Sequence, residues 1–190
     1  MIARGGRTVN AQSPVQKRTV QHIIQVTYEL LNTHYFDMLT VQQLCAEAEI
    51  NRSTFYRYFE DKYDLLYYLA QFIGREFEKR KQKHNDESTL NAFVAYFEEN
   101  KVIFKHVLSS ERSVEVLNEL KRIHSKLLRE EARTDDDALA QKIRESSQPE
   151  MFCDFISSGL IEILRNWTEN KYEEDTKTLF KFLNEIFHTL

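Results

Sequence analysis

The chain has 190 residues, of which 42% are hydrophobic and 29% charged, and it contains only four glycines and two prolines. This length suits one core, or one core plus a small module, and excludes a large multidomain assembly. The scarcity of glycine and proline favours helices joined by short turns. No apolar run approaches the roughly 20 residues that span a bilayer, and the start lacks the apolar centre of a signal peptide. We therefore expect a soluble, cytoplasmic protein.

The formal net charge of −4 is unevenly distributed along the chain. Residues 1–83 hold 12 Lys and Arg against 9 Asp and Glu, a net charge of +3, whereas residues 84–190 hold 14 against 21, a net charge of −7. An anionic partner is therefore expected to meet the front half.

The front of the chain predicts three helices. Residues 1–12 have the composition of a flexible basic tail. Ser13, Pro14 and Gln16 are typical of a capped helix start, and this helix should run to about residue 33. Thr40 and Gln43 repeat the capping pattern before a two-turn helix, and Asn51 suits the cap of a third, over residues 52–58. Two short helices separated by three residues must cross steeply, which predicts a helix-turn-helix.

The third helix lies within the stretch "NRSTFYRYFEDK" (residues 51–62). Phe55 and Phe59 share one face at helical spacing and are expected to enter a small core. The opposite face then presents Arg52, Ser53, Tyr56 and Arg57. Arginine pairs bidentately with guanine or grips phosphate, and hydroxyl groups donate to phosphate oxygens, so this face fits the major groove of duplex DNA.

The remaining sequence predicts longer helices. They are expected at residues 61–84, 88–99, 101–108, 111–132, 136–146, 149–169 and 173–189. The predicted fold is all-α, with about nine helices: an N-terminal three-helix helix-turn-helix headpiece (residues 13–62) and a C-terminal helical bundle body for effector binding and dimerisation (residues 63–190). Cys45 and Cys153 are expected to be buried free thiols.

The last two helices carry broad apolar faces, which suggest a second copy of the chain as partner. Packing of the same faces on the chain's own core is the alternative. The predicted interface residues are Phe152, Phe155, Ile156, Gly159, Ile163, Trp167, Leu179, Leu183 and Ile186.

The segment "LTVQQLCAEAEINRSTFYRYFEDKYDLL" resembles the DNA-binding signature of TetR-type transcriptional regulators. The resemblance covers about residues 13–70. Two further segments, "ENKVIFKHVLS" and "FISSGLIEILRNWTENKYEEDTKTL", are similar to a branch of that family, common in Gram-positive bacteria, that includes dihydroxyacetone operon activators. One departure is Glu49, where the family's turn usually carries glycine, so we expect a changed turn.

The resemblance implies specific DNA contacts. Base edges would be contacted by Gln42, Arg52, Ser53 and Arg57. Phosphates would be contacted by Thr40, Thr54, Tyr56, Tyr58, Lys62, Lys17 and Arg18. It also implies a small-molecule cavity in the body, lined by Phe72, Phe93, Phe97 and Phe104. Packing of these four rings in an ordinary core is equally compatible with their spacing.

Nothing in the sequence indicates catalysis, a cofactor or a metal site. The HExxH and GxSxG motifs and phosphate-binding glycine loops do not occur, and Glu185 with His188 is a single copy of a spacing that metal-binding bundles use twice. We expect a homodimeric, sequence-specific DNA-binding regulator that acts as a repressor on a palindromic operator, associates with the nucleoid when bound, and is released by an unknown small-molecule effector. The alternative is a regulator or activator whose body binds a co-regulator protein and no small ligand.

Overall fold

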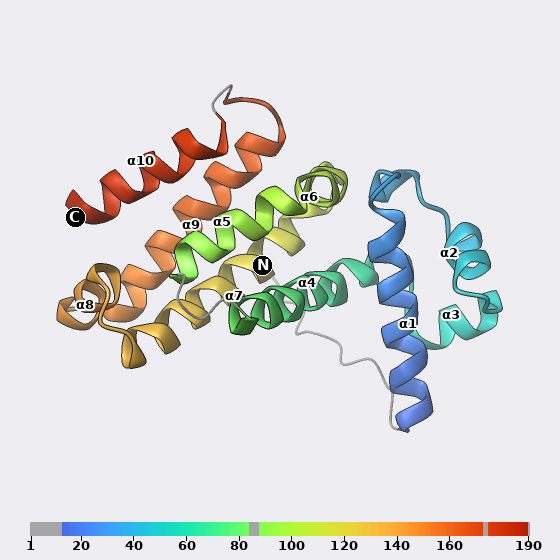
Figure 1. Ribbon diagram of the computed structural model, residues 1–190. Coiled ribbons are helices and arrows are strands. Elements are labelled where there is room, and N and C mark those ends of the chain that lie inside the picture. Colours follow the sequence, from blue (N-terminus) through green and yellow to red (C-terminus); the bar gives the residue numbers. More distant parts are fainter. Residues whose placement is uncertain (1–12, 84–87, 173–174, 190) are drawn as a thin grey trace, which may run out of the picture.

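The computed structural model describes residues 13–83, 88–172 and 175–189, and within these ranges the chain is helical without a strand (Figure 1). The all-α prediction is confirmed. The predicted basic tail (residues 1–12) lies outside the described residues. Among the residues that the structure describes, no helix is long and apolar enough to cross a membrane. The elements are α1 (Pro14–Leu30), η1 (Phe36–Met38), α2 (Val41–Glu47), α3 (Arg52–Tyr58), α4 (Asp64–Lys83), α5 (Thr89–Glu99), α6 (Lys101–Leu108), α7 (Ser113–Thr134), α8 (Ala138–Glu145), α9 (Pro149–Thr168) and α10 (Thr176–Thr189).

Both predicted capping boxes are present in the headpiece. The Ser13 hydroxyl accepts from the Gln16 amide while the Gln16 side chain accepts from the Ser13 amide, and Thr40 and Gln43 repeat this exchange at α2. Each box satisfies two amide groups that a helix start leaves without partners. The single 3-10 turn η1 was not predicted.

The turn between α2 and α3 keeps the geometry that glycine normally provides, so the expectation of a changed turn is wrong. Glu49 adopts φ 52°, in the left-handed region. The Ile50 amide donates to the Cys45 carbonyl (2.9 Å) and the Glu49 amide to the Ala46 carbonyl (3.2 Å), which together form a Schellman motif. The left-handed conformation is unfavourable for any residue that has a Cβ atom. At Glu49 it is held by these hydrogen bonds and by the burial of the neighbouring Ala48.

One continuous apolar core joins headpiece and body. It runs from Val20 in α1 through Phe55 and Phe59 to Leu183 in α10, and α4 contributes Leu65 and other buried side chains to it. In Figure 1, α4 leads from the headpiece, at the right, into the body. A second, smaller cluster joins the end of α7 to α8 and α9 and includes Cys153. Cys45 and Cys153 are buried free thiols, as predicted.

The predicted dimer residues divide between the core and the surface. Ile156, Trp167, Leu179 and Leu183 are buried within the chain's own core and are not available to a partner while this core is intact. Phe155 and Gly159 are exposed, and Phe152, Ile163 and Ile186 are partly exposed. Helices α6, α7 and α8 pack against α9 and leave its residues Met151 and Phe155 exposed.

The body contains a fully buried histidine. His124 in α7 lies with Nδ1 2.9 Å from Ser157 Oγ in α9, and its ring centre is 4.7 Å from that of Phe93. Its Nε2 has no hydrogen-bond partner among the described residues. Burial lowers the pKa of His124 from 6.5 to about 3, so the ring is neutral at physiological pH.

This low pKa predicts a loss of stability in acid. The unfolded chain binds the proton near pH 6.5 and the folded chain only near pH 3, so His124 destabilises the fold progressively as pH falls below 6.5. Each pH unit in that window costs about 1.4 kcal/mol. In urea unfolding, the free energy of unfolding of the parent should be lower at pH 5.5 than at pH 7.5. The same decrease should be about 1.4 kcal/mol smaller in His124→Asn, because asparagine does not titrate. Equal falls in both proteins would contradict the assignment.

The strained turn predicts a stabilising substitution. Glu49→Gly should raise the free energy of unfolding by about 0.5 to 1 kcal/mol, because glycine adopts a positive φ without a steric penalty. Glu49→Gln removes the same charge but retains a Cβ, and it should leave stability unchanged. Thermal unfolding of the three proteins measures both effects, and equal stability of the Gly and Gln variants would contradict the role of the backbone.

Candidate nucleic-acid interface

The outer face of α3 is the centre of the candidate site. Phe55 and Phe59 are buried, whereas Arg52, Ser53 and Arg57 are exposed and Tyr56 is 55% exposed. The Phe55 ring meets the Tyr56 ring edge to face at 5.5 Å and the Phe59 ring at 5.2 Å. The buried pair therefore sets the rotation of this seven-residue helix and directs the polar residues outward, as the sequence predicted.

Two of the predicted base-contacting residues are joined to each other. The Arg52 guanidinium donates to Gln42 Oε1 at 3.1 Å, from α3 to α2. Both side chains are exposed, so the hydrogen bond restrains them without burying them. The guanidinium retains further donors for a base edge, and the carboxamide nitrogen of Gln42 is a second donor beside it.

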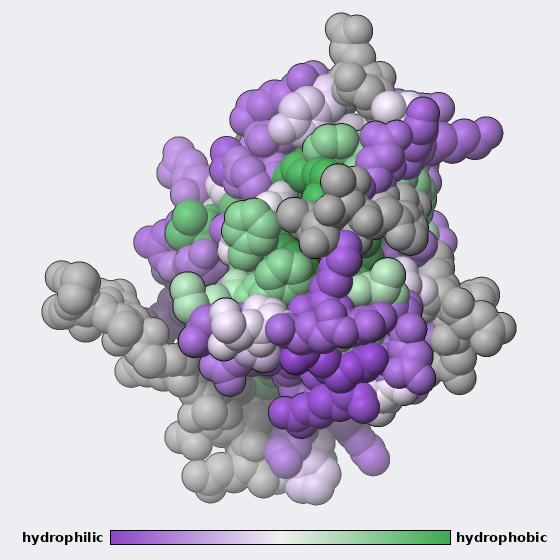
Figure 2. Space-filling model, turned by 90° about the vertical axis from the view of Figure 1, so that its left-hand side faces the viewer, coloured by the Kyte–Doolittle hydropathy of each residue, from purple (hydrophilic) through white to green (hydrophobic). Residues whose placement is uncertain are grey.

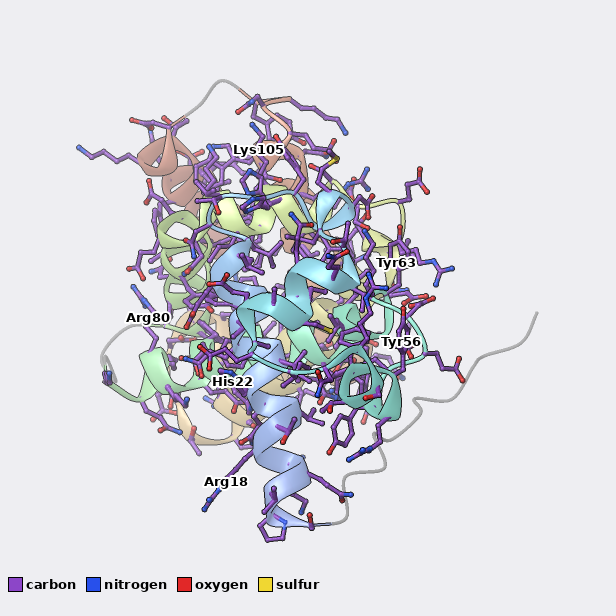
Figure 3. All side chains as sticks on the ribbon, turned by 90° about the vertical axis from the view of Figure 1, so that its right-hand side faces the viewer. Arg18, His22, Tyr56, Tyr63, Arg80 and Lys105 are labelled. Atoms are coloured by element: carbon purple, nitrogen blue, oxygen red, sulfur yellow. The ribbon has the colours of Figure 1, made fainter. Side chains whose placement is uncertain are left out.

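The residues predicted to contact phosphate differ in accessibility. Lys17 and Arg18 are exposed in the first turn of α1, and Thr40 is exposed at the start of α2. Thr54 and Tyr58 are half-buried, and Tyr58 packs against the core. Figure 3 views the headpiece side of the molecule and shows Arg18 near the N-terminal end of α1 and Tyr56 on α3, both at the periphery of the headpiece.

Lys62 is directed inward, unlike the other cations of this site. Its ammonium donates to the carbonyl oxygens of Asp37 (2.6 Å), Leu39 (2.8 Å) and Phe36 (3.3 Å). It also lies 5.5 Å and 5.2 Å from the centres of the Phe36 and Tyr63 rings. Three carbonyls use all three donors of an ammonium group, so this geometry assigns Lys62 to holding the chain before α2 and leaves it no donor for phosphate.

The four rings predicted to line a cavity are mostly packed together. Phe97 and Phe104 stack at 3.7 Å, and Phe93 contacts Phe77 and His124. Phe72 alone of the four borders the groove of about 770 Å³ that lies between α1, α4 and the end of α5. Tyr28 and Tyr96 also border this groove.

A set of contacts between headpiece and body was missed by sequence reasoning. The Asp37 carboxylate accepts from Ser110 Oγ (2.8 Å) and from the Glu111 amide (3.0 Å), and His106 Nδ1 donates to the Leu31 carbonyl (2.8 Å). These partners are more than 70 residues apart in the chain, and no local pattern marks them. Among the described residues, no three His, Cys, Asp or Glu side chains group closely enough to hold a metal ion.

The fold and the exposed α3 face define a helix-turn-helix DNA-binding regulator. Residues 23–69 match the family described as "Bacterial regulatory proteins, tetR family", and residues 84–189, more than half of the chain, match "Transcriptional regulator C-terminal region" of the same group. The chain belongs to the TetR family of transcriptional regulators. Both matching families are described as regulators.

Solved structures support the same fold. A "Dihydroxyacetone kinase operon activator DhaS" is 18% identical with a TM-score of 0.57, and the match covers 90% of this chain and 94% of that one. The "TetR Family Repressor AlkX" from Dietzia sp. strain DQ12-45-1b is 14% identical with a TM-score of 0.60 and coverages of 93% and 94%. No curated protein sequence matches the chain.

Different losses of DNA affinity are predicted for a residue expected to contact bases and for one expected to contact phosphate. Arg52→Ala should cost about 1 to 3 kcal/mol on the preferred duplex and little on a scrambled one. Lys17→Ala should weaken both duplexes alike and lower the slope of log affinity against log salt by about 0.9. Fluorescence anisotropy titrations at several salt concentrations measure these quantities. If Arg52→Ala discriminates the two duplexes as well as the parent does, Arg52 does not read bases.

Proposed function

We propose that the protein is a homodimeric repressor that binds a palindromic operator through α3. The observation that carries the proposal is the exposed face of α3, where Arg52, Ser53 and Arg57 face outward and Gln42 is hydrogen-bonded to Arg52. A twofold dimer places two such faces about one helical turn of DNA apart, in successive major grooves.

An apolar surface at the far end of the body supports dimerisation. Met151 and Phe155 on α9 are each 69% exposed, and Phe182 on α10 is also exposed. Figure 2 shows hydrophobic side chains gathered in the middle of this side of the molecule, within a surround of hydrophilic ones. Exposed aromatic and methionine side chains are typical of interface centres, and this surface lies away from the headpiece, so it suits a second copy that leaves α3 free.

Repression is the simpler mode of action for such a dimer, because it requires only that the protein occupy an operator that overlaps a promoter. The two similar structures are named an activator and a repressor, so the shared fold is compatible with activation as well as with repression. We place the protein in the cytoplasm, on the nucleoid when it is bound to DNA.

The groove between α1, α4 and α5 is the proposed effector site. Tyr96 is 5% exposed, and its hydroxyl lies beside the Tyr28 hydroxyl without a hydrogen bond of standard length and angle, because the Tyr28 hydroxyl donates to Asn100 Oδ1 at 2.8 Å. Burial beside Tyr28 raises the pKa of Tyr96, so its hydroxyl stays protonated and can donate. A small molecule with a ring and a hydrogen-bond acceptor would satisfy this donor, and it would contact headpiece and body together.

Selection of duplexes from a random pool tests the proposed function directly. The purified protein should enrich a palindrome whose half-sites are centred about one helical turn apart. A pool that stays random after several rounds, with the protein folded and dimeric, would refute operator binding.

The proposed dimer surface predicts a monomeric variant. Phe155→Glu places a charge in the apolar surface but does not disturb the chain's own core, because Phe155 is exposed. We expect a monomer in sedimentation velocity, with affinity lost for the full palindrome and retained for a single half-site. Val102→Glu is the matched control, since Val102 is an exposed apolar residue on α6. A dimeric Phe155→Glu would contradict the interface.

The proposed effector site predicts a selective loss of ligand response. In a thermal-shift screen of small metabolites, a ligand at 100 times its dissociation constant should stabilise the parent by about 2.7 kcal/mol. Tyr96→Phe should abolish most of this shift but change the stability of the ligand-free protein little, because the hydroxyl makes no hydrogen bond of standard geometry within the chain. A shift that survives the substitution would place the site elsewhere. A screen without hits, combined with capture of a defined cellular protein, would favour the co-regulator alternative.

A further inference from the structure

The connection between α1 and α2 is held by both of its neighbours. This connection, residues 31–39, includes the turn η1 and ends at Leu39, directly before Thr40, which caps α2. Phe36 and Leu39 are buried in the shared core. Any displacement of residues 36–39 is therefore passed to the start of α2, and through the short turn at Glu49 to α3.

The body holds this connection through the corner between α6 and α7. Ser110 is buried, and its hydroxyl donates to Asp37 Oδ1 (2.8 Å) while it accepts from the Arg112 amide (3.3 Å). The Glu111 amide donates to the second Asp37 oxygen (3.0 Å). Both carboxylate oxygens are thus bound by two consecutive residues of the corner between α6 and α7. Hydrogen bonds to a charged group are among the stronger ones in proteins.

Lys62, just before α4, holds the same connection through its main chain. The Lys62 ammonium donates to the main-chain carbonyls of Phe36, Asp37 and Leu39. Asp37 is therefore bound by its side chain to the body and by its main chain to Lys62. The Arg112 guanidinium also lies 4.6 Å from the centre of the Tyr63 ring, so the corner touches the start of α4 as well.

We propose that Asp37, Ser110 and Lys62 are positioning residues for DNA binding, which together form a latch between α7 and the start of α2. This inference rests on the proposed DNA-binding function and adds a connection that does not run along α4. Helix α7 packs against α4, α8 and α9, so it is in contact with the helix that carries the proposed dimer surface. The latch gives α7 direct control over the orientation of α2 and α3. A shift of α7 in the body moves the headpiece even where α4 keeps its place.

Loss of one hydroxyl far from DNA tests the latch. Ser110→Ala should lower affinity for the selected palindrome about tenfold, which is the loss expected when one hydrogen bond to a carboxylate is removed. Asp37→Ala should act in the same direction, because it removes both oxygens that accept from the Ser110 hydroxyl and the Glu111 amide. Ser109→Ala is the matched control, since Ser109 is exposed and its hydroxyl donates to Lys105 in its own helix. It should bind as the parent does.

Two measurements distinguish a latch from a general loss of stability: the energetic coupling between residues 37 and 110, and the hydrogen-exchange rates of α2. The Asp37→Ala/Ser110→Ala double variant should bind no more weakly than Asp37→Ala alone, because the Ser110 hydroxyl has already lost its acceptor in the single variant. In hydrogen exchange without DNA, the amides of α2 should exchange faster in Ser110→Ala and at the parent rate in Ser109→Ala. Parent affinity in Ser110→Ala, additive losses in the double variant, or unchanged exchange in α2 would each overturn the latch.

Salt dependence separates the role of Lys62 from a phosphate contact. Lys62→Met keeps an unbranched apolar stem but removes the donors, so it should weaken DNA binding without changing the slope of log affinity against log salt. Lys17→Ala, which removes a phosphate contact, should lower that slope by about 0.9. A slope lowered by the same amount in Lys62→Met would overturn the positioning role of Lys62. If the parent itself binds no duplex, the proposed function fails, whereas the hydrogen-exchange comparison still tests the latch.

Discussion

The site depends on the burial of two phenylalanine rings. Helix α3 has seven residues, too few to be stable alone in water, so its position comes from tertiary packing. Phe55 and Phe59 anchor it from inside, and because they recur at helical spacing they leave one side of the helix for polar groups. Arg52, Ser53 and Arg57 are presented outward only while this packing holds, so core and interface are two faces of the same short helix.

The shared core explains how a small headpiece can respond to the body. Headpiece and body are not separate globules joined by a linker, since buried side chains run without a break from α1 to α10. Packed interiors change between discrete arrangements and do not deform continuously, so a rearrangement around α7 has a direct mechanical route to α2. Polar contacts strengthen that route, because the Asp37 carboxylate binds the corner before α7 and the Lys62 ammonium binds the carbonyls of residues 36–39.

Charge differs between the two halves of the chain. The front half has a small positive excess and the rest of the chain a larger negative one. The negative body is repelled by phosphate, which favours approach of DNA from the headpiece side. Glu49 is one of six acidic residues among residues 13–62, and its Schellman motif forms at a cost in backbone strain.

The sequence by itself determined the helices, both capping boxes, the helix-turn-helix and the outward face of α3. These features depend on residues three or four positions apart, and such local relations can be read directly from spacing. The tertiary structure alone decided which side of α9 and α10 is covered, where the Lys62 ammonium points, and that Asp37 meets Ser110. Those contacts join residues more than 20 positions apart, and a broad apolar face or a single charge does not specify its partner until the chain has packed.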